Sequence, residues 1–360
     1  MRNVLIAALL VSVCVIPAHA RSPAGWMVEL ELDGRKIEGM PLAWNREEVH
    51  LLGRDGHLWQ FAPGEAKNYR KTSSRFQSYS TSKLRAVLLR ELGDAYEVSG
   101  TGHYMVAHPR GERSQWAQRF EDLYRSFVHY FSVRGFDLEE PPCPLIGVVC
   151  RNRREFFAYS ASRGLPAGYG VLGSYSVESN RIVLYDLTGG KGDAAGWEHT
   201  ASTIIHEATH QTAFNTGVHS RFTMPPLWVA EGLATMFEAP GVYHSRSFTG
   251  QGDRINRLRF RHFNELVVPR HKPELLAALV ASDRPFRTHP SVAYATAWAL
   301  TFYLMETDRG KYAEYLTRTA ERPPFQDYPA AARTADFTQV FGDDWRMLEA
   351  RLLRFIAGLK

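Results

Sequence analysis

The segment from Trp197 to Asn215 constrains the fold of this chain more than any other stretch. On a helical wheel, where successive residues are about 100° apart, it separates into two faces. The residues of one face are apolar: Trp197, Ala201, Ile204, Ile205 and Ala208. Those of the opposite face are polar: Thr203, His206, Glu207 and His210. The chain must therefore bury one side of a long helix and leave its titratable side accessible.

The polar face contains the order H-E-x-x-H, formed by His206, Glu207 and His210. The two histidines are one turn apart and about 40° apart around the axis, so both imidazoles can converge on one ion while Glu207 projects beside it. The alternative is an ordinary amphipathic helix that carries two histidines by chance. The chain has 14 His among 360 residues. At that frequency a chance match somewhere in the chain arises with a probability on the order of a few per cent, so the motif needs a third ligand.

Glu231 is the candidate for that third ligand. It lies in an almost wholly apolar segment, PPLWVAEGLATMFE, which starts at Pro225 and is predicted to form a buried helix. A buried carboxylate without a positive partner is costly. A metal held by His206 and His210 would be that partner, and the alternative is an arginine from elsewhere in the chain. Two His and one Glu leave the fourth tetrahedral position of zinc open for water, as in catalytic sites, so we predict one Zn²⁺ ion here.

The two segments together carry a resemblance to a known group of proteins. HEATHQ followed by PLWVAEGLATMFE resembles the gluzincin, or thermolysin-like, clan of zinc peptidases, and most closely a bacterial family of "peptidase MA-like" proteins. The resemblance is most specific over residues 196–238 and extends over residues 95–310. It implies a gluzincin-like fold and hydrolysis of a peptide or protein substrate. This chain departs from thermolysin at Ala230, where thermolysin has Asn, and at Thr235, where an Asp would orient a ligand histidine.

The resemblance also implies roles for single residues. His206, His210 and Glu231 would bind one zinc ion, and Glu207 would be the general base that takes the proton of the zinc-activated water. Related enzymes often present a tyrosine from a downstream helix to the developing oxyanion, which makes Tyr294, in SVAYATAWALTFYLME, our candidate for that donor. The alternative is a tyrosine packed in an apolar helix with its hydroxyl satisfied.

Three further polar residues near the motif are weaker candidates. Glu238 follows Glu231 by seven residues, on nearly the same side of the predicted helix. It could hydrogen-bond to a ligand histidine, but we expect it to face solvent or an ion-pair partner instead. His219 and His244 lie in the loops around the second helix, and we expect both at the surface.

The remaining pattern predicts an α+β fold with a small β module before the main domain. Residues 21–64 alternate apolar and polar positions between Asp-Gly turns, which is typical of short strands in a small, barrel-like module. Residues 65–81, rich in Ser, Lys, Arg and Tyr, are predicted to be a linker. In residues 82–360 strands come first and helices later, which fits a gluzincin-like metallopeptidase domain with a small sheet and a helical half. This domain is predicted to have helices at 83–92, 113–133 and 154–162, strands at 96–99, 103–108, 145–149 and 181–185, and mainly helix after 196.

Residues 1–20 have the pattern of a secretory signal peptide. Arg2 provides a positive start, the run Val4–Ile16 is apolar, and A-H-A is a small-x-small cleavage signal that ends at residue 20. The apolar run is shorter than the stretch of about 20 residues that a bilayer span needs. We therefore expect an exported protein, periplasmic or secreted, without stable membrane insertion.

The charge of the chain argues against nucleic acid as a partner. The formal net charge is only +5, and the expected leader contributes one of the arginines. The densest basic group, formed by Arg151, Arg153 and Arg154, is expected in a solvated turn. With 44% hydrophobic residues the chain can bury a substantial core.

Cys143 and Cys150 are the cysteines that remain after the expected leader. The segment PLIGVV between them reads as a buried strand, and seven extended steps span about 23 Å. A disulfide needs Cα atoms within about 7 Å. Either the chain reverses near Gly147 or the two thiols stay apart, and we predict two free thiols.

The favoured function is that of an exported zinc metallopeptidase. The first alternative is a gluzincin-like binding protein without activity, whose N-terminal β module docks to a partner in the cell envelope. The second is a structural α+β protein with a coincidental motif. Zinc content tests the second alternative, and chelator-sensitive proteolysis separates the first from the favoured function.

Overall fold

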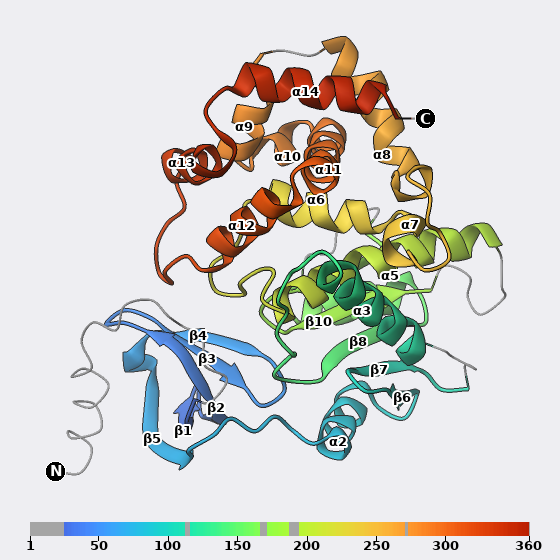
Figure 1. The fold of residues 1–360 in the computed structure, drawn as a ribbon. Coiled ribbons are helices and arrows are strands. Elements are labelled where there is room, and N and C mark those ends of the chain that lie inside the picture. Colours follow the sequence, from blue (N-terminus) through green and yellow to red (C-terminus); the bar gives the residue numbers. More distant parts are fainter. Residues whose placement is uncertain (1–24, 112–115, 166–170, 187–193, 271–272, 360) are drawn as a thin grey trace.

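The computed structural model describes residues 25–111, 116–165, 171–186, 194–270 and 273–359, with the backbone alone for residues 194–200. In this part of the chain two five-stranded sheets come before a mainly helical half, which is the α+β class that the sequence predicts (Figure 1). The expected signal peptide, residues 1–20, lies outside the described residues. None of the described helices combines the length and the apolar composition of a membrane span.

The first sheet forms an N-terminal β module and is antiparallel throughout, in the order β4-β3-β2-β1-β5. Asp33 and Gly34 both have positive φ and connect β1 to β2 in the tight turn that the Asp-Gly sequence predicts. Apolar side chains such as Val28 and Leu30 form its core. The order has two edges, β4 and β5, so the described strands form an open sheet and not a closed barrel. The strands are β1 (Met27–Leu32), β2 (Arg35–Trp44), β3 (Val49–Gly53), β4 (Leu58–Phe61) and β5 (Ala66–Ser73).

Strand β5 corrects the predicted linker. It pairs antiparallel with β1, whereas the sequence pattern assigned residues 65–81 to a linker. Most side chains of β5 are polar and exposed, so the strand has no apolar alternation by which the sequence could show it. Backbone hydrogen bonds hold it at the edge, where its lysines suit an exposed strand.

The second sheet is mixed, in the order β6-β7-β8-β10-β9. Strands β7, β8 and β10 are parallel neighbours, while β6 and β9 pair antiparallel at the two edges. Helices α2 and α4 cover one face of the sheet, and α3 and α5 cover the other. The sequence pattern missed β9, because GSYS is short and has no apolar alternation. The elements are α2 (Thr81–Leu92), β6 (Tyr96–Gly100), β7 (Tyr104–Pro109), α3 (Trp116–Ser132), β8 (Leu145–Cys150), α4 (Arg153–Ser162), β9 (Gly173–Ser176), β10 (Arg181–Tyr185) and α5 (Ala194–Asn215).

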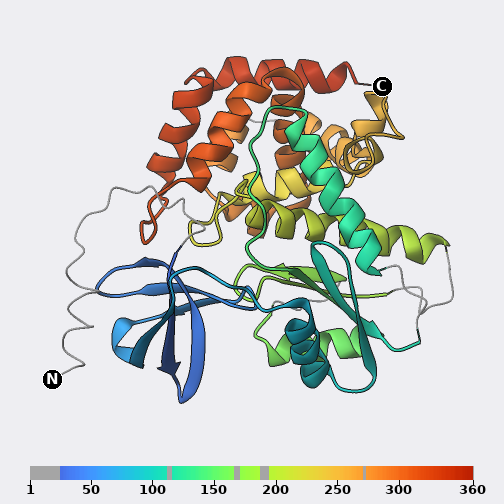
Figure 2. The same cartoon turned by 60° about the horizontal axis from the view of Figure 1, so that its bottom comes forward.

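The helical half packs around α11, which is buried along most of its length. Helix α6 crosses α11 closely at Gly232, where a Cβ would lie 2.7 Å from the carbonyl oxygen of Ala297, so the crossing requires glycine. Figures 1 and 2 show α14 on the far side of α11 from α6. The helices are α6 (Leu227–Phe237), α7 (Pro240–Tyr243), α8 (Arg257–His262), α9 (Leu275–Ala281), α10 (Arg284–Thr288), α11 (Pro290–Thr307), α12 (Arg309–Ala320), α13 (Ala330–Phe341) and α14 (Trp345–Ala357).

The β module contacts the turn between β9 and β10 (Figure 2). The backbone N–H of Leu58 donates to the carbonyl of Glu178 at 2.7 Å. Arg221, from the loop after α5, donates to the carbonyls of Gly56 and Val177 at 2.8 and 2.6 Å. These bonds fix the module against the sheet on which the histidine helix packs.

Both described cysteines are buried free thiols, which confirms the prediction for Cys143 and Cys150. Burial raises the pKa of each thiol to about 12. Cys143 lies against the β module and donates to the carbonyl of Gly53 at 3.9 Å. The two thiols therefore serve as small apolar groups in the packed interior.

Candidate metal centre

Helix α5 lies between the second sheet and α6, and its apolar residues are shared between two cores. Ile204 and Ala208 pack on the sheet, while Ile205 packs with the helical half. The side chain of Trp197, which was expected on the same face, lies outside the described residues. The H-E-x-x-H side chains are partly exposed between the two cores. The wheel pattern is therefore confirmed for Ile204, Ile205 and Ala208, which are buried, while Ala201 is partly exposed.

The side chains of His206, His210 and Glu231 converge. The Nε2 atoms of the two histidines are 3.1 Å apart. The carboxylate of Glu231 places Oε2 3.3 Å from His206 Nε2 and Oε1 3.7 Å from His210 Nε2. One ligand atom from each residue lies within 4.8 Å of the others, and in the described part of the chain this is the group that could hold a metal ion.

The electrostatics of the cluster favour a positive charge at its centre. Burial alone would raise the pKa of Glu231, but His210 and His206 outweigh it and hold the pKa well below its usual range. Burial alone would lower the pKa of His206, but Glu231 and Glu238 outweigh it and raise the pKa well above its usual value. Oε2 of Glu231 is nevertheless buried without a hydrogen-bond partner among the described residues. Two imidazole nitrogens and one carboxylate with an unused oxygen fit Zn²⁺.

Glu238 corrects the expectation of a solvent-facing carboxylate. Its Oε1 accepts a hydrogen bond from Nδ1 of His206 at 2.8 Å, and its Oε2 accepts one from Nδ2 of Asn256 at 2.8 Å. The same amide group of Asn256 donates to the carbonyl of Thr235 at 2.8 Å, which ties Glu238 to the end of α6. Seven residues are about two helical turns, so Glu238 points to the same side as Glu231, toward α5. Holding Nδ1 in this way leaves the lone pair of Nε2 free for a metal. The hydroxyl of Thr235 instead donates to the carbonyl of Glu231 at 2.7 Å.

A backbone group holds Glu207 in place. The N–H of Tyr175 in β9 donates to Oε2 of Glu207 at 2.6 Å. The hydroxyl of Tyr175 donates to Oδ1 of Asn180 at 2.9 Å, and the side chains of Asn180 and Asn215 hydrogen-bond at 2.9 and 2.7 Å. The carboxylate is therefore fixed between α5 and the edge strand. No sequence signal could have shown this contact, because its donor is a main-chain amide.

Tyr294, from α11, faces the same cluster. Burial raises its pKa well above the usual value, and the neighbouring carboxylates of Glu231 and Glu207 raise it further, while Arg259 lowers it. The ring packs edge-on against Phe286, with centroids 5.2 Å apart. The hydroxyl therefore keeps its proton at neutral pH and can donate a hydrogen bond toward the cluster.

His219 is buried with 2% of its surface exposed, so the expectation of a surface residue is wrong. The loop after α5 folds its ring against Phe214, with centroids 5.2 Å apart, and its Nδ1 donates to the carbonyl of Val218 at 3.0 Å. Burial, and next the charge of His210, lower the pKa of His219 to about 3, so the ring is neutral at pH 7. Its Nε2 has no hydrogen-bond partner among the described residues. His244 is exposed, as predicted.

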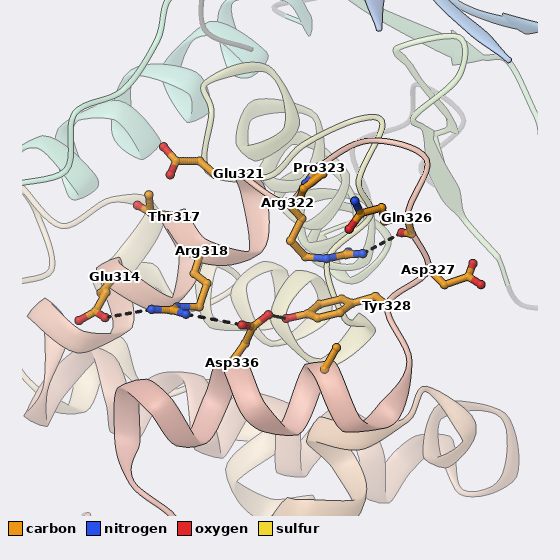
Figure 3. Close-up of a pocket in the computed structure, with 11 residues that line it drawn as sticks. Glu314, Thr317, Arg318, Glu321, Arg322, Pro323, Gln326, Asp327, Tyr328 and Asp336 are labelled. Atoms are coloured by element: carbon orange, nitrogen blue, oxygen red, sulfur yellow. Dashed lines mark hydrogen bonds and ion pairs between the residues drawn. The ribbon is translucent and has the colours of Figure 1, made fainter. Parts of the chain in front are cut away.

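A cavity of about 620 Å³ lies elsewhere, between α12 and α13 (Figure 3). Arg318 lies 3.8 Å from Glu314 and 3.6 Å from Asp336. The guanidinium of Arg322 stacks on the ring of Tyr328, whose hydroxyl donates to Asp336 at 2.8 Å. Arg318, Tyr328 and Asp336 thus have partners among the residues that line this cavity, unlike Oε2 of Glu231 in the histidine cluster, which has none among the described residues.

Comparison with known proteins finds one family model that matches the part of the chain containing the centre. The family described as "Protein of unknown function (DUF1570)" matches residues 200–326, which include His206, His210 and Glu231. No curated protein matches the chain. Among solved structures, a variant of an M1 zinc metallopeptidase from Deinococcus radiodurans is similar, with a TM-score of 0.37 and 14% sequence identity. The similarity covers 73% of this chain and 50% of that chain, so this chain spans about half the length of that protein.

Proposed function

We propose that this chain is a gluzincin-like zinc peptidase that hydrolyses peptide bonds with Glu207 as general base. The observation that supports the proposal most is the convergence of His206, His210 and Glu231 within 4.8 Å, beside a separately held Glu207. Three protein donors leave one position of a tetrahedral zinc open, which suits a catalytic site and not a structural one.

Proton transfer is the task of Glu207. Zinc, when bound by the three donors, polarises the carbonyl of the substrate and lowers the pKa of water to about 7. Glu207 accepts the proton of the attacking water and passes it to the leaving amine. The N–H of Tyr175 keeps the carboxylate in one orientation for both transfers, because a hydrogen bond from the main chain of a strand has little freedom to move.

Stabilisation of the developing oxyanion is the proposed task of Tyr294. Its raised pKa keeps the hydroxyl protonated, and its ring is fixed against Phe286. A hydrogen-bond donor that is already in position stabilises the transition state most where negative charge develops.

A peptide as substrate is supported by the position of β9. This strand ends the sheet order, so its outer edge has no strand partner among the described residues. Exposed sheet edges bind extended peptides by main-chain hydrogen bonds. A peptide that pairs with β9 would lie beside Tyr175 and therefore beside Glu207.

The test compares the purified wild type with Glu207→Gln, and with Glu47→Gln as a control at an exposed position. All three should hold one zinc ion per chain. The wild type and the control should cleave a proteome-derived peptide library, and a chelator should abolish the cleavage. Glu207→Gln should be slower by at least about 100-fold, because it lacks the general base.

Two results would change the proposal. A Glu207→Gln protein that cleaves as fast as the wild type would exclude Glu207 as the base. Stoichiometric zinc without any cleavage by the wild type would instead support the inactive, gluzincin-like binding protein.

A further inference from the structure

The guanidinium of Arg259 is a positive charge close to the proposed centre. Its Cζ lies 5.0 Å from the centre of the Tyr294 ring, and its Nε is buried without a hydrogen-bond partner. No described residue forms an ion pair with it. Arg254, five residues earlier, instead makes hydrogen bonds of 3.0 and 2.7 Å to both oxygens of Glu306. A guanidinium stays charged at physiological pH. The charge of Arg259 therefore has no carboxylate within ion-pair distance among the described residues.

Hydrogen bonds connect α8, the helix of Arg259, to the residues around the candidate metal centre. Asn256 caps α8 through its Oδ1, which accepts the N–H of Arg259 at 3.1 Å. The Nδ2 group of the same Asn256 donates to Glu238, the residue that holds His206. The start of α8 is thereby fixed relative to the histidines, and the position of Arg259 is fixed with it.

Tyr294 lies between the charge of Arg259 and the carboxylates of the cluster. Its ring contacts Arg259, and its hydroxyl is close enough to Glu231 and Glu207 for their charges to act on it. Arg259 therefore lies on the side of the cluster where Tyr294 would meet the scissile carbonyl. A group on the substrate only a few atoms from that carbonyl can reach the guanidinium.

We propose that Arg259 binds a carboxylate of the peptide substrate next to the scissile bond. The inference rests on the peptidase function proposed above, and it makes the protein selective for peptides with a carboxylate near the cleavage point. A guanidinium matches a carboxylate with two parallel hydrogen bonds. A neutral carbonyl would satisfy one N–H but leave the positive charge uncompensated. The carboxylate is the C-terminus of the peptide or the side chain of an Asp or Glu, which present the same group to Arg259.

The experiment uses three variants of the zinc-loaded, full-length protein. Arg259→Gln removes the charge. Arg259→Lys keeps the charge but removes the planar guanidinium, which can donate two parallel hydrogen bonds. Arg261→Gln is the matched control, because Arg261 is an exposed arginine of the same helix. Peptides that the wild type cleaves in a proteome-derived library are resynthesised in three forms: unchanged, with a C-terminal amide, and with the nearest Asp or Glu replaced by Asn or Gln.

The kcat/KM values of the three forms identify the recognised carboxylate. For the wild type and Arg261→Gln, we expect the form without that carboxylate to be cleaved about 10- to 100-fold more slowly. A slow amide form identifies the C-terminus, and a slow Asn or Gln form identifies the side chain. Arg259→Gln should cleave all three forms at similar low rates, and Arg259→Lys should recover part of the selectivity.

A binding measurement gives a readout that does not depend on turnover. In the zinc-loaded Glu207→Gln background, adding Arg259→Gln should weaken binding of the unchanged peptide about 10-fold or more in calorimetry, with equal zinc content and equal melting temperature. Selectivity that persists in Arg259→Gln would overturn this inference and leave the peptidase function intact. Absence of any cleavage by the wild type would overturn both.

Discussion

Glu121 and Glu231 are both helical glutamates that lie beside a histidine in the interior. The side chain of Glu121 is 1% exposed. Its oxygens accept hydrogen bonds from Thr101 Oγ1, His103 N, His103 Nδ1 and Arg125 Nε, at 2.9, 3.0, 2.9 and 2.9 Å. The side chain of Glu231 is 15% exposed, and its Oε2 has no hydrogen-bond partner among the described residues.

The two clusters differ in what they leave for a ligand. Burial alone would raise the pKa of Glu121, but the hydrogen bonds from His103, Arg125 and Thr101 lower it to about 2. These donors use both oxygens, so the carboxylate ties the β6–β7 turn to α3 and has nothing left for a metal. Oε2 of Glu231 has no hydrogen-bond partner among the described residues, and its carboxylate lies 3.3 and 3.7 Å from the Nε2 atoms of His206 and His210. A buried Glu–His pair thus indicates a metal site only when the carboxylate remains unsatisfied by the protein.

The substitution Glu231→Gln should have the largest effect on zinc affinity and should show most clearly that the two clusters differ. It replaces a charged donor by a neutral one, so we expect the affinity for zinc to fall by more than about 100-fold, beyond the loss expected for a group that only orients a ligand. Competition with a fluorescent zinc chelator measures the affinity. Glu121→Gln is the matched control and should bind zinc like the wild type. Unchanged zinc affinity in Glu231→Gln would exclude this cluster as the metal site.

The substitution Glu121→Gln should leave zinc affinity unchanged but lower the stability of the fold. Because the amide nitrogen of Gln cannot accept the hydrogen bonds that one carboxylate oxygen receives, we expect a loss of about 2 to 3 kcal/mol in the free energy of unfolding. Urea unfolding of the metal-free proteins at pH 7 measures this loss. Glu231→Gln should lose less in the same measurement. Equal losses for the two variants would refute the distinction between a structural tie and a metal ligand.

The stabilisation by Glu121 should disappear in acid. Its pKa is about 2 in the folded chain, against the ordinary value of 4.5. A depressed pKa stabilises the fold above the unfolded value and loses that contribution as the pH falls through the folded value. The difference in unfolding free energy between the wild type and Glu121→Gln should therefore shrink from pH 5 through pH 4 to pH 3. A difference that stays constant over this range would show that the charge of Glu121 is not its source.

The substitution Glu238→Gln should have the smallest effect on the metal cluster. It keeps an oxygen that can accept from Nδ1 of His206 but removes the charge behind it, so we expect zinc affinity to fall about 10-fold, at the low end for groups that orient a ligand. The chelator competition used for Glu231→Gln measures this effect. An affinity equal to that of the wild type would mean that Glu238 does not orient His206 for metal binding.

Several features of the centre could be predicted from the sequence because they follow from periodicity and from the cost of burying charge. The two faces of α5 arise from the spacing of its apolar residues. Glu231 could be predicted as a ligand because an apolar helix does not bury a carboxylate without a partner. The strands of the second sheet and the helices that cover it were predicted largely where the structure has them, except for β9. That strand is short and polar, and its pairing with β10 stabilises it in place of side-chain burial.

Other features depend on contacts that no local pattern encodes. Glu238 was expected to face solvent, and this prediction was wrong because its partner His206 is 32 residues away and on another helix. His219 was expected at the surface because it lies in a loop, whereas the fold packs its ring against Phe214. The surroundings of Arg259 could not be predicted, since the sequence does not show which residues contact an arginine.

The sequence by itself determined which groups are present for chemistry and on which side of α5 the histidines lie, since helical periodicity places residues without reference to the rest of the chain. The tertiary structure alone decided how those groups are held. It brought Glu231 to the two histidines, placed Glu238 behind His206 and fixed Glu207 against the main chain of β9. It also left Arg259, beside Tyr294, without an ion-pair partner among the described residues. The physical reason is that hydrogen bonds and charge compensation act between atoms a few ångströms apart, and only packing decides which distant residues come that close.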